Sequence, residues 1–120
     1  MPFDNLAPKV ERLVRSLLQS TDDDLVEWST TADDDAYRLT SKTANIQIQR
    51  SEIFDPEGES DLRRTLLVFN RQGRLVEEYT PRHGGEIDIF DRLFQAARRS
   101  ACKTDAILDQ LLEEIEQGSD

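Results

Sequence analysis

The sequence predicts an α+β domain in which helices cover one face of an antiparallel sheet. Apolar residues recur with a helical period of 3.6 near both ends of the chain and with a strand period of 2 in the middle. Short polar connections separate the middle segments, and short connections join antiparallel strands, whereas parallel neighbours need long crossovers. The length of 120 residues predicts one domain over 1–120. We therefore expect an N-terminal helix, a five-stranded antiparallel meander, and two C-terminal helices packed on one sheet face.

The N-terminal helix is predicted over residues 4–20. Its apolar residues are spaced by one, three or four positions, which places them on one helix face that can pack against a sheet. These residues are Leu6, Val10, Leu13, Val14, Leu17 and Leu18.

The strand region is predicted over residues 25–79. Five segments carry the strand pattern, and the turn-forming stretches "TADDDA", "DPEGES" and "NRQG" separate several of them. In the first three segments the apolar positions alternate with polar ones and predict the core-facing side: Val26, Trp28, Tyr37, Leu39, Ile46 and Ile48.

Two more helices are predicted over 87–101 and 104–117. Each carries an apolar stripe, and Gly118 is suited to ending the second helix. The preceding stretch "TPRHGGEIDIF" is interpreted as a hinge, in which Pro81 stops the strand and Gly84-Gly85 permit the chain reversal.

The predicted sheet has a second face that the helices leave uncovered. Alternation places polar side chains there, and this face is either solvated or a docking surface for another protein. As protein-binding residues we select Arg38, Gln47 and Gln49 on this face, together with Arg98 and Arg99 on the penultimate helix.

An alternative site lies at Arg82 and His83, beside the only histidine of the chain. A small enzyme or ligand-binding domain with its site here is the rival hypothesis. The sequence has neither a G-x-S-x-G nucleophile motif nor a phosphate-binding glycine motif. We therefore expect no catalytic residues, no cofactor and no metal site, and favour a protein that is not an enzyme.

The charge of the chain also excludes function classes. The net charge is −10, which argues against nucleic-acid binding because such binding uses a positive surface. Clusters of acids leave a third hypothesis, an acidic mimic of nucleic acid that sequesters a basic protein. No stretch approaches the ~20 apolar residues of a membrane span, and one cysteine excludes an internal disulfide. We expect a cytoplasmic protein.

The C-terminal stretch "LFQAARRSACKTDAILDQLLEEI" combines an "ARRxA" run with a "D-x-x-L-D-x-L-L" helix. In this it resembles a group of small, acidic, uncharacterised bacterial proteins. The resemblance implies a bacterial origin and an α+β domain, and it transfers no activity and no functional residue.

These observations together favour a non-catalytic protein-binding or regulatory domain. The expected partner is another protein, with a homodimer left open because an amphipathic helix can bury its stripe on the sheet or on a second copy.

Overall fold

The computed structural model describes residues 2–82 and 84–118, with their side chains from residue 8 onward. These residues form three helices and one five-stranded antiparallel sheet with strand order β1-β2-β3-β4-β5, so the predicted fold class is confirmed. The elements in chain order are α1 (Pro2–Asp22), β1 (Ser29–Thr30), β2 (Ala36–Thr40), β3 (Ala44–Phe54), β4 (Ser60–Asn70), β5 (Leu75–Tyr79), α2 (Gly84–Ala101) and α3 (Thr104–Gln117).

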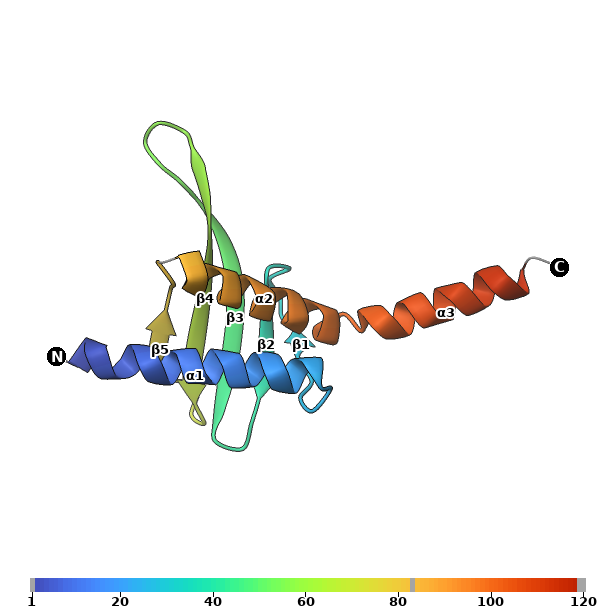
Figure 1. The fold of residues 1–120 in the computed structure, drawn as a ribbon, viewed down its shortest axis with the longest axis horizontal. Helices are drawn as coiled ribbons and strands as arrows, with labels where there is room; N and C mark the ends of the chain where they lie inside the picture. The colour runs from blue at the N-terminus through green and yellow to red at the C-terminus, as the bar shows by residue number, and fades with distance from the viewer. Residues whose placement is uncertain (1, 83, 119–120) are drawn as a thin grey trace.

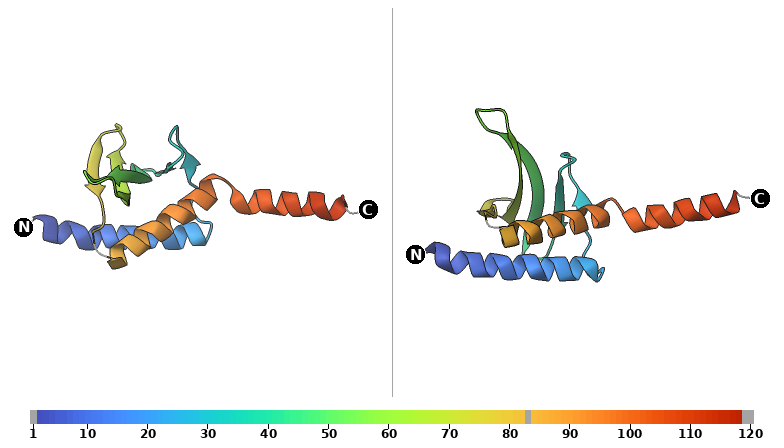
Figure 2. Two further views of the ribbon diagram at one scale, coloured as in Figure 1. Left: turned by 90° about the horizontal axis from the view of Figure 1, so that it is seen from above. Right: turned by 45° about the horizontal axis from the view of Figure 1, so that its top comes forward.

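Helices α1 and α2 lie side by side over one face of the sheet and cross its strands (Figure 1). The other face carries no helix, as the view from above shows (Figure 2). The core lies between the two helices and the sheet, where the predicted stripes of α1 and α2 meet the inward side chains of the strands. Its buried members are Val10, Val14, Leu17, Trp28, Tyr37, Leu39, Ile46, Ile48, Leu66, Phe90, Leu93, Phe94 and Ala97.

Strand alternation predicts the two faces of β2 and β3 correctly. Tyr37, Leu39, Ile46 and Ile48 are buried, whereas Arg38 between them is exposed. The first strand is shorter than predicted, because residues 25–28 have no strand pairing and β1 begins only at Ser29. Trp28 is nevertheless buried.

Strands β3 and β4 continue as a two-stranded arm beyond the part of the sheet that the helices cover (Figure 1). Their pairing runs without interruption from Ala44 opposite Asn70 to Phe54 opposite Ser60. The side chains from residue 51 to residue 63 are all exposed. Two ion pairs stand at the base of the arm, Arg50 with Asp35 and Arg64 with Asp91, each with a closest N–O distance of 3.0 Å.

The position of α3 differs from the predicted packing on the sheet. None of its described residues is buried, and the helix projects from the domain beyond β1 (Figures 1 and 2). The helix-bearing face of the sheet is already covered by α1 and α2, so it offers α3 no place. The projection gives a radius of gyration of 17.0 Å, compared with about 14 Å for a compact domain of this length.

The glycine pair before α2 does not have its predicted role. Gly84 and Gly85 lie in the first turn of α2, whereas the glycines with positive φ are Gly58 in the β3–β4 turn and Gly73 in the β4–β5 turn. The chain does pass from β5 to α2 in the predicted stretch, but the two glycines belong to the helix and neither has a positive φ.

This arrangement predicts that Gly85→Ala raises the free energy of unfolding by about 0.5–1 kcal/mol, because alanine favours the helix and loses less backbone entropy on folding. A Cβ at Gly85 meets no atom within 4 Å. Urea unfolding at one pH measures the change. Gly73→Ala is the matched control, and since its φ is 83° it should lose stability. A loss of stability in Gly85→Ala would contradict the helical assignment.

Candidate functional site

Helix α3 carries an exposed apolar stripe, which we call the α3 stripe: Ile107, Leu108, Leu111, Leu112 and Ile115. These five side chains retain between 46% and 58% of their accessible surface. Spacings of one, three and four residues place them on one face of the helix. A continuous apolar face on a projecting helix is typical of a surface that another chain covers.

The rest of α3 is acidic. Residues 104–117 contain five acids and no lysine or arginine, and the acids are Asp105, Asp109, Glu113, Glu114 and Glu116. Asp109 and Glu116 are seven residues apart and lie along one edge of the α3 stripe. The helix therefore presents an apolar face that is bordered by acidic side chains.

The chain changes direction at the α2–α3 junction, where two exposed ion pairs lie. Lys103 has a left-handed backbone with φ 52°, which breaks the helical path after α2. Its ammonium group pairs with Glu27, and Arg99 Nη2 pairs with Asp105 Oδ1 at 3.0 Å. A cleft of about 590 Å³ lies beside the junction, and Leu25, Glu27, Arg99 and Lys103 are among its lining residues. Both cations of this cleft are thus engaged in ion pairs.

The predicted residues of the uncovered sheet face form one connected row. Arg38 Nη2 donates to Gln47 Oε1, and Gln47 Nε2 donates to Gln49 Oε1, both at 3.0 Å. The Arg38 guanidinium also lies 5.8 Å from the ring centre of Phe69. Arg98 and Arg99 do not join this row, because they belong to the last turn of α2 on the helix-bearing side of the sheet.

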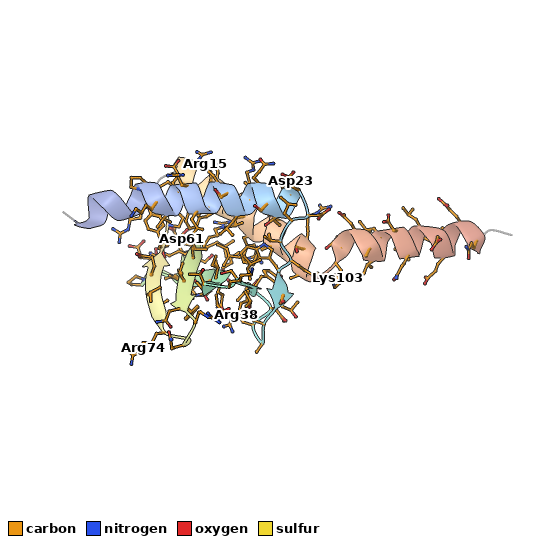
Figure 3. All side chains as sticks on the ribbon, turned by 90° about the horizontal axis from the view of Figure 1, so that it is seen from below. Arg15, Asp23, Arg38, Asp61, Arg74 and Lys103 are labelled. Atoms are coloured by element: carbon orange, nitrogen blue, oxygen red, sulfur yellow. The ribbon has the colours of Figure 1, made fainter. Side chains whose placement is uncertain are left out.

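Toward the β4–β5 turn the uncovered face becomes apolar. Leu67 and Phe69 are half-buried, while Leu75, opposite Phe69, and the neighbouring Val76 are 49% and 57% exposed. Arg38 and Arg74 point away from the helices on this side (Figure 3). Neither arginine forms an ion pair with the side chains of residues 8–82 and 84–118. We call Arg38, Leu67, Phe69, Arg74 and Leu75 the open-face seat.

The alternative site at Arg82 lies in a second cleft of about 520 Å³, between the base of the arm and the start of α2. His83 lies outside the described residues. Two of the three arginines in this cleft are paired with carboxylates, Arg64 with Asp91 and Arg63 with Asp61. The hydroxyl of Thr80, which also lines it, is hydrogen-bonded to Thr65. The described part of this cleft thus offers one unpaired cation and no activated nucleophile.

Among the described residues, three side chains have pKa values clearly shifted by their surroundings. The Lys103 ammonium lowers the pKa of Glu27 through a hydrogen bond and its charge. Burial raises the pKa of Tyr37, and burial together with the hydrogen bond to Glu86 raises that of Tyr79. Each of these shifts moves the pKa away from neutrality, whereas a general acid or base works best with a pKa near the operating pH. None of the three is therefore suited to proton transfer.

Within residues 2–82 and 84–118, no three described His, Cys, Asp or Glu side chains are grouped so as to hold a metal ion. No helix there combines the length and the apolar character needed to cross a bilayer. Comparison of the chain with protein-family models, with curated proteins and with solved structures gives no match.

Proposed function

We propose that this protein is a non-catalytic protein-binding module and that α3 is its binding element. The α3 stripe carries this proposal, because five large apolar side chains about half exposed on one helix face are costly to leave in water. An amphipathic helix that lays its apolar face on a partner is a common form of protein recognition.

The separation of α3 from the core supports the same function. The buried cluster draws on α1, α2 and the sheet, and no described residue of α3 belongs to it. The α3 stripe therefore contributes little to folding, although it places apolar surface in solvent. Binding of a partner chain accounts for such a surface.

The setting we infer is the cytoplasm of a bacterium. The single, exposed Cys102 supports a reducing compartment, because no disulfide can form within the chain.

The test is to compare protein association before and after the α3 stripe is made polar. The double variant Leu108→Gln/Leu112→Gln keeps good helix formers and changes two exposed stripe residues. We expect its affinity for protein partners, including other copies of the chain, to fall at least about tenfold, which corresponds to about 1.4 kcal/mol. Capture of the tagged protein from its source cells, with quantitative mass spectrometry, measures the loss.

The matched control is Gln110→Ala/Gln117→Ala, which alters the opposite face of α3 and should leave association unchanged. Thermal unfolding should give the same midpoint for all three proteins, because no described α3 residue is buried. Equal recovery of every partner by the wild type and the stripe variant would refute the role of α3.

A further inference from the structure

We propose that the chain covering α3 is a second copy of this protein, and that α3 of each copy lies on the open-face seat of the other. This inference rests on the proposed function of α3 as a binding element, and it adds the identity of the partner and the surface that receives the helix.

The charge of α3 restricts what can cover it. A second α3 would bring five acids of one helix against five acids of the other, with no cation on either. Like charges at close range oppose association. The covering surface must therefore combine apolar side chains with cations.

The open-face seat meets both requirements. Leu67, Phe69 and Leu75 provide apolar surface across β4 and β5, with Phe69 and Leu75 at paired positions of the sheet. Arg38 and Arg74 stand on the same side (Figure 3), and among the side chains of residues 8–82 and 84–118 neither has a carboxylate partner. In a protein with a net charge of −10, these two unpaired cations beside exposed apolar side chains complement an acidic amphipathic helix.

Glu78 limits where the helix can lie. It is exposed and pairs with Leu67 in the sheet register, so it borders the seat on the side away from the β4–β5 turn. An acidic helix is repelled from this border, which favours the row that contains Phe69 and Leu75, close to Arg74.

Helix α3 is long enough to cross this row. The 14 residues of α3 span about 21 Å at ~1.5 Å per residue. The row that contains Phe69 and Leu75 runs over four strands, β2 to β5, which at a spacing of ~4.8 Å is about 14 Å wide. Helices α1 and α2 already cross the strands on the opposite face (Figure 1), so a helix crossing the uncovered face would complete a layered arrangement.

The exchange has to occur between copies. Helix α3 leaves its own domain beyond β1, with the exposed Lys103–Glu27 and Arg99–Asp105 pairs at the junction (Figure 1). Its own open-face seat lies at the β4–β5 side of the sheet. A two-fold dimer allows each copy to give one helix and to receive one, which doubles the buried surface.

The experiment is a charge swap followed by mass measurement. In the first variant, Asp109→Lys/Glu116→Lys, the edge of α3 becomes basic. In the second, Arg38→Glu/Arg74→Glu, the seat becomes acidic. Sedimentation equilibrium should show a wild-type dimer and, for each variant alone, a dissociation constant at least about tenfold higher. An equimolar mixture of the two variants should again form a dimer, because an interface that joins the basic helix to the acidic seat then brings opposite charges together.

The control is Arg12→Glu/Arg92→Glu, which makes the same charge change on exposed residues of α1 and α2 and should remain dimeric. A monomeric wild type, a dimer that persists in both swap variants, or a mixture that stays monomeric would each overturn the inference. A monomeric wild type that still captures a different protein through the α3 stripe would leave the proposed function standing. If the protein is captured equally well by the variant with the polar α3 stripe, the proposed function is refuted as well.

Discussion

Trp28→Ala is expected to lower the free energy of unfolding by roughly 3–5 kcal/mol, the usual cost of truncating a buried tryptophan. Trp28 is 2% exposed and lies where the end of α1, the start of the sheet and the end of α2 meet. Its indole Nε1 donates to Thr21 Oγ1 at 2.9 Å, and its backbone N–H donates to Ser100 Oγ at 3.0 Å. Truncation leaves a cavity at this meeting point and leaves Thr21 without its indole partner.

Urea unfolding followed by far-UV circular dichroism measures the loss, since the variant has no tryptophan for fluorescence. Substitutions at Thr21 measure the contribution of the indole hydrogen bond separately. The Thr21 hydroxyl also donates to Leu17 O at 2.6 Å. Thr21→Val removes the acceptor of the buried indole and should cost about 1–3 kcal/mol, while Thr21→Ser keeps the acceptor and should cost less. A Trp28→Ala protein as stable as the wild type would contradict the core described above.

Phe94→Ala is expected to lower the free energy of unfolding by a similar amount, roughly 3–5 kcal/mol. Phe94 is 0% exposed and joins α2 to the sheet. Its ring lies 5.4 Å from the Tyr37 ring, and the Arg50 guanidinium lies 4.9 Å from its centre. The substitution therefore removes an aromatic pair and a cation–π contact together with apolar volume.

Trp28 fluorescence during urea unfolding measures this second loss. Phe94→Leu is the first control, because it keeps most of the apolar volume and removes the ring, so it should lose clearly less stability than alanine. The neighbouring Gln95 is exposed, so Gln95→Ala, the second control, should change stability by less than about 0.5 kcal/mol. Equal losses in Phe94→Ala and Phe94→Leu would show that ring contacts, not volume, dominate at this position.

The fold could be predicted wherever an element has one apolar and one polar face. Tyr37 and Leu39 alternate with Arg38, and this pattern alone places the arginine on the uncovered side. The stripe of α2 likewise identifies Phe90, Phe94 and Ala97 as core residues. Local periodicity sufficed here because a neighbouring element covers each apolar face.

The position of α3 could not be predicted in the same way. Its stripe, from Ile107 to Ile115, has the same spacing as the stripes of the packed helices. Periodicity shows that a face is apolar, but it does not show which surface covers that face or whether the surface belongs to the same chain. The absence of any lysine or arginine between residues 104 and 117 was the available signal that this helix differs.

The candidate site was predictable in part. Alternation grouped Arg38, Gln47 and Gln49, and the structure links these three by hydrogen bonds. Arg74 was missed because it lies in a turn, where no period assigns a side. The sequence also could not show that Arg98 and Arg99 lie on the opposite side of the sheet from that row, because this depends on how α2 is placed.

The pairing of α1 with α2 also sets the time at which the core can close during synthesis. The Trp28–Ser100 hydrogen bond joins residues 72 positions apart, and the α1 stripe reaches its neighbours only once α2 exists. About 80 residues separate Leu17 from Ala97, so at ~5–20 residues per second the ribosome needs roughly 4–16 s between them. Over that interval the apolar face of α1 is open to chaperones and to misassociation. Helix α3 is synthesised after α2. Its apolar stripe therefore reaches solvent when α1, α2 and the sheet can already have packed together.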